Sequence, residues 1–339
     1  IGTVADVVDL TGENRAIVAL GLIDLVRTNN WGLKALMEVA DCRSDMTSMH
    51  IGFRIGPRIN AAGRMQVGTH VVELLESDDF GGARRIANLL DSHNRERQKV
   101  QKEVTEKAIL EASTFPNSTF VVVAGEGWHK GVVGLAASRV AEKFYRPTIV
   151  FSLEDGIATG SARSIKGFDL FEALGSVSDL LESFGGHVAA AGMKAKQSNI
   201  DELRSRLNNY ADEKIPVDKR TPELLIDAVV TTDTLSLELV EDLSAFEPFG
   251  AGNPKPIFLT KGLILRDEPF VMKDKHLKLK LVGDGNKQFE AVWWDGVERS
   301  KGQTLKPNSR IELAYVAEAN TWQGNTRLQL VVEDLRADN

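Results

Sequence analysis

The segment GEGWHKG (125–131) combines glycines with side chains that suit a charged ligand. Its glycines free backbone N–H groups between an expected strand and an expected helix, and the N-terminus of a helix attracts anions. Lys130 adds positive charge, and His129 can donate to a phosphate or act as an acid or base. Trp128 has two interpretations, stacking on a base or filling the domain's surface. The segment is no Walker A sequence, which disfavours nucleoside triphosphate binding.

GSARS (160–164) and FGGHVAAAG (184–192) add three more polar side chains. On the expected strand, Ser161 and Arg163 are two residues apart and therefore project from the same face. The guanidinium of Arg163 matches two phosphate oxygens with parallel hydrogen bonds, and a neighbouring hydroxyl can fill a third. His187 stands among small residues, where another molecule can approach closely. Taken alone, His187 is more typical of a structural histidine.

A basic stretch without carboxylates precedes these segments. From residue 46 to residue 72 the sequence has no Asp or Glu, although the whole chain has a formal net charge of −7. A phosphate-binding groove does not require a basic chain, because the field of that groove decides the contact. The alternative is a turn whose arginines cap helices or pair with acids. The polar side chains of IGPRINAAGRM (55–65), set among small residues, are Arg58, Asn60 and Arg64.

Asp6 lies in GTVADVV, where we expect the end of an apolar strand. A carboxylate at the carboxyl end of a strand in an α/β sheet is a common metal ligand, and the alternative is a helix cap or a turn. Two catalytic ions about 3.5–4 Å apart need several carboxylates or histidines. The sequence contains no DxD, HxH or DHH cluster. By itself, this chain is therefore short of ligands for a two-metal site.

One long helix is expected between Ala83 and Ser113. This stretch has neither Gly nor Pro, and its apolar residues recur about every 3.5 residues with charges between them. At about 1.5 Å per residue, such a helix is about 45 Å long. A helix of this length more often links two lobes than packs inside a compact bundle.

A mixed α/β domain is expected after this helix. A strand, a helix and a second strand predict a parallel, right-handed crossover. A further strand, a helix, the glycine turn FGGH and a last helix follow. In chain order these elements are expected over 120–125, 132–144, 147–153, 157–163, 168–183 and 200–214. Ahead of the long helix we expect the opening strand and helices over 18–27 and 33–40.

The last third alternates apolar and polar residues over four segments, 275–282, 288–294, 310–319 and 326–335. Short antiparallel strands separated by turns predict a small β-barrel, with the OB-fold as the first candidate. In the alternative to a binding surface, Leu277, Leu279 and Leu281 face the core and the lysines between them are simply solvated. The side chains that resemble a platform for stacked bases and phosphates are Trp293, Trp294, Trp322, Lys273, Lys275, Lys278 and Lys280.

The composition excludes several classes of protein. No apolar run approaches the roughly 18 residues that span a bilayer, so no membrane partner is expected. Cys42 is the single cysteine, which excludes an internal disulfide and favours a reducing, cytoplasmic location. The chain opens with IGTVADVV, without Met and within a strand-like run, so we expect further sequence upstream.

Together, these motifs resemble the RecJ family of the DHH phosphoesterase superfamily, in its C-terminal two-thirds. The matching segments are GTVADVV, GFRIGPRINAAGRM, GWHKGVVGLAASRVAEKFYRPTIVF, GSARSIKGFDL, FGGHVAAAGM and EPFGAGNPKPIF (247–258). The resemblance runs along nearly the whole chain. It implies an α/β fold class in four parts: the end of a DHH-type catalytic domain (1–82), a long connecting helix (83–114), a mixed α/β DHH-associated domain (115–215) and a C-terminal OB-fold β-barrel (216–339).

The resemblance also implies roles for single residues. In that family two Mn²⁺ or Mg²⁺ ions are held by aspartates and a paired histidine, and only the Asp6 motif of that set is present here. Asp6 is therefore implied to be metal-binding and catalytic. The residues implied to contact nucleic acid, along a channel that admits one strand, are Arg58, Asn60, Arg64, Asn94, Arg97, Gln98, Trp128, His129, Ser161, Arg163 and His187.

The implied function is a 5′→3′ exonuclease specific for single-stranded DNA, in DNA repair and recombination, in which a metal-activated water attacks the phosphodiester. The implied partners are single-stranded DNA, single-strand-binding protein and recombination helicases. Two alternatives stay open: a DHH-family phosphodiesterase of oligonucleotides or cyclic dinucleotides, and a single-strand-binding module without catalysis. The C-terminal barrel and the GWHKG segment favour the exonuclease, and this chain alone is expected to be inactive.

Overall fold

The computed structural model describes residues 1–42, 45–64, 68–301, 303 and 305–337. The chain divides into two compact units, one of Ile1–Ile23 with Leu224–Asn339 and one of Asp24–Glu223. The first residues therefore group with the C-terminal region, and the domain predicted over 1–82 stays a prediction. Among the described residues, no helix is both long and apolar enough to cross a bilayer.

The chain opens with a short helix, so the expected opening strand is wrong. Helix α1 spans Gly2–Ala5, and Asp6 terminates it with an exposed side chain. The N–H groups of Ala5 and Asp6 bond back to Ile1 and Gly2 at 3.0 and 2.9 Å. A strand needs a neighbour to satisfy its backbone, and no described strand pairs with this segment.

Among the described residues, six more helical elements precede the long helix. The helices expected over 18–27 and 33–40 correspond to α2 (Gly12–Val26) and α3 (Trp31–Val39). The short helix α4 (Ser48–His50), a π-helical stretch (Ile51–Ile55), α5 (Gly56–Arg64) and α6 (Thr69–Leu75) follow. The basic segment 55–65 is thus helical where it is described, not a turn. Pro57, which has no N–H to donate, stands two residues after the end of the π-helical stretch, where the hydrogen bonding of the helix is already irregular.

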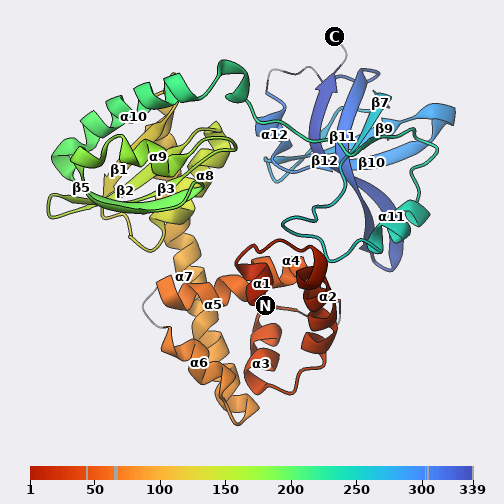
Figure 1. The fold of residues 1–339 in the computed structure, drawn as a ribbon. Helices are drawn as coiled ribbons and strands as arrows, with labels where there is room; N and C mark the ends of the chain where they lie inside the picture. Colours follow the sequence, from red (N-terminus) through yellow and green to blue (C-terminus); the bar gives the residue numbers. More distant parts are fainter. Residues whose placement is uncertain (43–44, 65–67, 302, 304, 338–339) are drawn as a thin grey trace. The chain divides into compact units, whose positions relative to one another are not determined.

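The long helix is present as α7, which spans Phe80–Ser113 over 34 residues. The side chain of Asp79 caps it by accepting from the Gly82 N–H at 2.8 Å. Its buried residues change partners along its length. The first half packs against α3, α5 and α6, and the second half packs against α8 and β1 (Figure 1). The helix therefore links a helical part and a sheet within one unit, as its periodicity predicted.

The sheet of this unit has the order β1-β2-β3-β5-β4. Strands β1 and β2 are parallel and flank α8, as expected for a crossover, and the other pairings are antiparallel. Helix α10 covers the core formed by the buried side chains of the sheet. The elements are β1 (Val121–Glu126), α8 (Val133–Phe144), β2 (Thr148–Glu154), β3 (Ile157–Arg163), α9 (Leu170–Gly175), β4 (Leu181–Gly186), β5 (Ala190–Lys196) and α10 (Ile200–Lys214).

The helix expected over 168–183 is shorter in the structure. Helix α9 ends at Gly175, a 3₁₀ turn (Ser178–Leu180) follows, and β4 takes up the rest. The apolar residues of this stretch fit a helical period, but β4 pairs with β5, with an irregularity between Leu181 and Ser183. Pairing with the neighbouring strand therefore overrides the helical pattern.

The unit of Ile1–Ile23 and Leu224–Asn339, called the C-terminal unit below, contains the remaining strands. Their order is β6-β7-β11-β12-β10-β9-β8. Strand β9 also pairs with β7, so β7, β11, β12, β10 and β9 form a closed ring of pairings. The pairing of β10 with β12 is parallel, which corrects the expectation of antiparallel strands alone. The elements are β6 (Ala228–Val229), α11 (Leu237–Ser244), β7 (Phe258–Leu265), β8 (Phe270–Met272), β9 (His276–Val282), β10 (Gln288–Trp293), α12 (Gly296–Arg299), β11 (Arg310–Trp322) and β12 (Asn325–Ala337).

The segment EPFGAGNPKPIF (247–258) packs against the first residues of the chain, within the same unit. The Leu10 side chain is buried, and a Cβ atom on Gly250 would lie 2.7 Å from its Cδ1, so glycine is needed there. The Leu10 N–H donates to the Ala251 carbonyl at 2.6 Å. Arg15 donates to two further carbonyls beside this segment, at 2.9 and 3.2 Å. These contacts hold the N-terminal segment on the C-terminal region.

Candidate nucleic-acid interface

Ser161 and Arg163 lie on one face of β3, toward the first turn of α8, as their spacing predicted. A Cβ atom on Gly134 would lie 3.4 Å from the Ser161 Oγ and 3.2 Å from the Arg163 Nη2. Glycine at the start of α8 thus lets the helix approach both side chains. The first N–H groups of a helix have no acceptor inside it. With the hydroxyl and the guanidinium they make a place suited to a phosphate.

The fold fixes the position of the Arg163 guanidinium. Its Nε donates to the Ser138 Oγ at 3.1 Å, and its Nη1 donates to the Ala162 carbonyl at 2.7 Å. Ser138 in turn donates to the Gly134 carbonyl at 3.2 Å. Ser138 was not among the residues predicted from the sequence. Its position four residues after Gly134, on the same face of α8, was the signal that could have found it.

The turn before α8 presents His129 to solvent. The His129 Nδ1 accepts from the Gly131 N–H at 3.0 Å. In the neutral ring, Nε2 then carries the proton and can donate to a ligand. Lys130 forms an ion pair with Glu154, and this hydrogen bond lowers the pKa of the Glu154 carboxyl. The Glu154 carboxylate therefore balances the charge of Lys130, whereas the sequence led us to expect that Lys130 adds positive charge to a ligand site.

Trp128 is buried and offers no face for stacking on a base. It belongs to the core formed by α7, α8 and β1. A Cβ atom on Gly125 would lie 2.1 Å from the Trp128 ring, so the ring covers that glycine directly. Its carbonyl accepts from the Ser152 hydroxyl at 2.5 Å. Trp128 therefore positions the turn that carries His129. Of its two interpretations, packing within the domain is the one found, not stacking on a base.

His187 is exposed in the turn between β4 and β5, at the same end of the sheet as Arg163. The ladder places Arg163 opposite Ala190, and the His187 N–H donates to the Ala190 carbonyl at 2.9 Å. The Ser164 N–H donates to the Ala189 carbonyl at 2.9 Å, which ties this turn to the end of β3. The structure thus places the His187 turn beside the end of β3. The turn that carries His129 follows Glu126, and the strand registers put Glu126 at the opposite end of the sheet from Arg163.

Arg58 is bound to a carboxylate from a distant part of the chain. Its Nε and Nη2 lie 2.9 and 2.8 Å from the Asp91 Oδ1, and both side chains are largely buried. Asp91 also pairs with Arg95 at 2.7 Å. The acid-pairing alternative for Arg58 is therefore the arrangement found. Arg95, which the sequence analysis did not select, keeps an exposed side chain beside it.

The other predicted residues of α5 and α7 differ in exposure. Asn94 is buried, and its Oδ1 accepts from the Arg97 Nη2 at 2.9 Å. Arg97 also donates to the Gln101 Oε1 at 2.8 Å. Asn60 and Gln98 are exposed. Arg64 ends α5, and its side chain lies outside the described residues, as does Met65.

The described residues do not fit a metal centre. Among them, no group of three or more His, Cys, Asp or Glu side chains could hold an ion. Asp6 is exposed at the end of α1. Because a two-metal site needs several such ligands, we derive no metal-dependent step for this chain, and the roles implied for Asp6 stay predictions.

The C-terminal unit offers only part of the expected stacking platform. Trp293 is fully buried, whereas Trp294 and Trp322 are 52% and 74% exposed. Leu277, Leu279 and Leu281 face the core, as the alternative predicted. Three of the four lysines pair with carboxylates: Lys275 with Asp295, Lys278 with Glu290 and Lys280 with Asp267, at 3.0, 3.0 and 3.3 Å.

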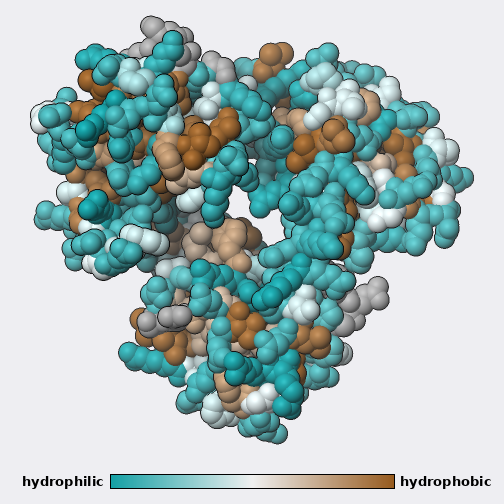
Figure 2. All heavy atoms as spheres, turned by 180° about the vertical axis from the view of Figure 1, so that it is seen from behind, coloured by the Kyte–Doolittle hydropathy of each residue, from teal (hydrophilic) through white to brown (hydrophobic). Residues whose placement is uncertain are grey.

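Apolar side chains also reach the surface. Hydrophilic side chains cover most of the face in Figure 2, with apolar patches between them. On α2, Ile17, Leu20 and Ile23 are all more than half exposed. Their spacing of three residues places them along one side of the helix.

Comparison with known proteins agrees with this architecture. Two family models match, the DHHA1 domain over residues 117–213 and the RecJ OB domain over residues 226–334. The single-stranded-DNA-specific exonuclease RecJ of Bacillus subtilis is 38% identical over 98% of this chain and 43% of its own length. The protein of the same name from Salmonella typhimurium is 31% identical over 99% of this chain and 60% of its own length. This chain belongs to the RecJ family.

A solved structure of the RecJ family has the same fold along the whole chain. The crystal structure of RecJ from Thermus thermophilus in complex with Mg²⁺ matches with a TM-score of 0.87 and 29% identity, over 100% of this chain and 51% of that one. Its complex with Mn²⁺ matches with a TM-score of 0.85. The chain spans about half the length of the RecJ-family proteins that it matches, 43% and 60% in the two relatives above.

Proposed function

We propose that this chain is the strand-holding part of a RecJ-family exonuclease that degrades single-stranded DNA from its 5′ end. The relatives named above carry the name of a single-stranded-DNA-specific exonuclease. In a protein of their full length, Mn²⁺ or Mg²⁺ is the proposed cofactor, and Asp6 is proposed as one of its ligands. DNA repair and recombination are the proposed processes.

One observation carries the proposal for this chain, the arrangement of Ser161 and Arg163 beneath the first turn of α8. A hydroxyl, a guanidinium and the first backbone N–H groups of α8 lie beside one another there, and each of these groups suits a phosphate oxygen. We propose that they bind the backbone or the terminal 5′ phosphate of a strand. His187 would extend this contact from the neighbouring turn. His129 would meet the strand farther along, at the other end of the sheet, where Trp128 supports its turn.

We propose that the exposed residues of α5 and α7 contact the strand and that the buried ones do so less. Arg95, Asn60 and Gln98 are exposed and able to reach a strand. Arg58, Arg97 and Asn94 are engaged within the fold, so we propose that they shape this surface and contribute less to binding. Trp294 and Trp322 are the proposed stacking residues of the OB domain.

The test is a comparison of single and double strands. Fluorescence anisotropy of this chain with matched labelled oligonucleotides should give tighter binding to the single strand, because the proposed contacts are to one backbone. The affinity should fall as salt rises, since each phosphate contact releases counterions. Equal affinity for both forms, or an affinity that ignores salt, would refute the proposed strand-holding role.

A second candidate function is a binding module without catalysis. It is favoured by the absence of a metal-binding group among the described residues. A phosphodiesterase of short oligonucleotides or cyclic dinucleotides is less favoured, because the RecJ OB domain over 226–334 suits a longer strand. Single-strand-binding protein and recombination helicases are proposed as protein partners, and the cytoplasm as the location.

A further inference from the structure

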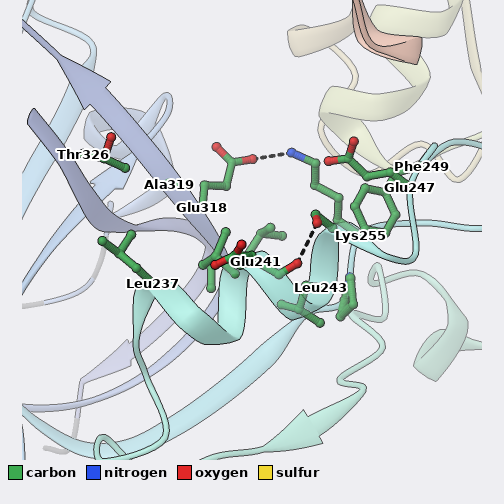
Figure 3. A pocket seen from close by; sticks show the side chains of 14 residues that line it. Leu237, Glu241, Leu243, Glu247, Phe249, Lys255, Glu318, Ala319 and Thr326 are labelled. Carbon is green, nitrogen blue, oxygen red and sulfur yellow. Dashed lines mark hydrogen bonds and ion pairs between the residues drawn. The ribbon is translucent and has the colours of Figure 1, made fainter. Parts of the chain in front are cut away.

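A groove lies beside the long hairpin of the C-terminal unit, with a volume of about 650 Å³. Helix α11 forms one wall, with Leu237, Val240 and Glu241 among its lining residues. Residues 316–319 of β11 form the other wall, and Lys255 bridges one end by pairing with Glu318 at 2.5 Å (Figure 3). All of these residues belong to one compact unit.

Strand β11 is unpaired on the side away from β12 along its second half. Its pairing with β7 stops at Tyr315, while its pairing with β12 continues to Trp322. A two-residue turn with positive φ at Gln323 and Gly324 joins β11 to β12. In such a hairpin the pair that flanks the turn exchanges both hydrogen bonds, and the bonded pairs then alternate.

This alternation decides which backbone groups of β11 are open. Counting back from Trp322, residues 320, 318 and 316 bond to β12, so Ala317, Ala319 and Thr321 direct their N–H and C=O groups to the other side. Among the described residues, no hydrogen bond joins those groups to another part of the chain. Ala317 and Ala319 also line the groove. The groove therefore runs along an open strand edge about 20 Å long.

The groove is apolar with an excess of carboxylates. All of its lining residues are described, and they include three carboxylates, Glu241, Glu247 and Glu318, and a single cation, Lys255. Lys255 is already paired with Glu318. Carboxylates repel the phosphates of a DNA strand and attract lysine and arginine. The charge of the groove therefore selects a cationic occupant.

We propose that this groove binds an extended polypeptide segment with alternating basic and apolar residues, which adds as a strand to the open edge of β11. An unpaired edge offers backbone hydrogen bonds to a strand of any sequence. The apolar side chains would fill the floor between α11 and β11, and the basic ones would meet Glu241 and Glu247. The occupant is a partner protein, and the site is separate from the strand-holding region around Arg163.

The first experiment uses a fluorescein-labelled octapeptide of alternating lysine and valine with blocked ends, titrated into this chain. An octapeptide of alternating glutamate and valine is the control. The basic peptide should bind in anisotropy, and the acidic one at least tenfold more weakly. Equal binding of the two would overturn the proposal, and so would displacement of the basic peptide by oligothymidylate, which would make the groove a DNA site.

Amide hydrogen exchange followed by NMR tests strand addition directly. At a peptide concentration ten times its dissociation constant, the amides of Ala317, Ala319 and Thr321 should exchange about tenfold more slowly. The amides of Glu318 and Asn320 already bond to β12 and serve as internal controls that change little. Binding without this alternating protection would overturn the proposal.

Two variants separate the edge from the charge. Ala319→Pro removes one outward N–H, which an edge strand tolerates, and should weaken the basic peptide about tenfold while circular dichroism stays unchanged. If that variant does not fold, Glu241→Lys with Glu247→Lys should produce the same loss, with Glu238→Lys on the outer side of α11 as the control without effect. Unchanged affinity in the folded variants would refute the site.

Concentration-dependent dimerisation of the wild-type chain that Ala319→Pro abolishes would assign the edge to a second copy instead.

Discussion

Arginines that look equivalent in the sequence have different partners in the structure. Arg58 meets Asp91 in a largely buried pair, whereas Arg163 is held by a hydroxyl and a carbonyl beside the first turn of α8. The first arrangement satisfies a buried carboxylate. The second fixes the guanidinium beside the first turn of α8, where we propose that a phosphate binds. The place of each guanidinium in the fold is therefore the basis for proposing a structural role for Arg58 and a binding role for Arg163.

Arg163→Ala is expected to weaken single-strand binding by about 1–3 kcal/mol, the range for hydrogen bonds to a charged group. The free energy of unfolding should fall by only about 1 kcal/mol, because Ser138 and the Ala162 carbonyl can turn to water. If Arg163 grips the terminus, the loss will be larger for a 5′-phosphorylated strand than for a 5′-hydroxyl strand. Anisotropy with both oligonucleotides and thermal unfolding measure the two effects.

Arg58→Ala is the matched control. It leaves the buried Asp91 with Arg95 alone, so the free energy of unfolding should fall by about 3 kcal/mol, the lower end for breaking a buried pair. An Arg163 variant with unchanged affinity and a similarly lowered melting temperature would mean that this arginine, too, is structural.

At the scale of elements, the half-buried carboxylate of Glu111 on α7 contacts both the sheet and α10. Glu111 accepts from the Ala124 N–H of β1 at 3.2 Å and lies 3.5 Å from Arg204 of α10. Burial raises the pKa of the Glu111 carboxyl, although the hydrogen bond from Ala124 and the charge of Arg204 oppose the rise. A raised folded-state pKa means that this group stabilises the fold most below its unfolded pKa, and that this contribution is lost as pH rises through the folded one.

Glu111→Gln should therefore gain stability relative to the wild-type chain as pH rises from 4 to 7. Glutamine keeps the acceptor for Ala124, and Arg204 keeps its pair with Asp201 at 2.6 Å. Denaturant unfolding at several pH values measures the difference. Glu106→Gln, at an exposed position of the same helix, is the control and should show no such trend. A Glu111→Gln variant that is less stable by the same amount at every pH would contradict the burial argument.

At the scale of the whole molecule, the described residues include the proposed strand-holding side chains and no group of three or more ligands for a metal ion. Incubated with Mn²⁺ and 5′-labelled single-stranded DNA, it is expected to release no nucleotides, because the described residues offer Asp6 no companion ligands. A full-length RecJ-family protein assayed in parallel is the positive control. Metal-dependent release that co-purifies with this chain and disappears in Asp6→Ala would contradict the expectation.

Local patterns in the sequence determined the elements whose stability is itself local. The run without Gly or Pro predicted α7, and the strand Ile157–Arg163 and the helix Ile200–Lys214 have the bounds that their periodicity indicated. The same-face relation of Ser161 and Arg163 follows from strand geometry alone. Family membership was likewise readable, because long motifs in a fixed order do not depend on knowing how they meet.

Only the tertiary structure decided which surfaces meet. It paired Arg58 with Asp91, 33 residues away, turned Trp128 inward over Gly125, and made a strand of Leu181–Gly186 where the local period favoured a helix. It also ended the pairing of β7 at Tyr315, which leaves the far half of β11 with an open edge. In each case the deciding free energy comes from packing or pairing with another element, such as α7 for Trp128 and β5 for Leu181–Gly186, and the pattern within one element does not contain that partner.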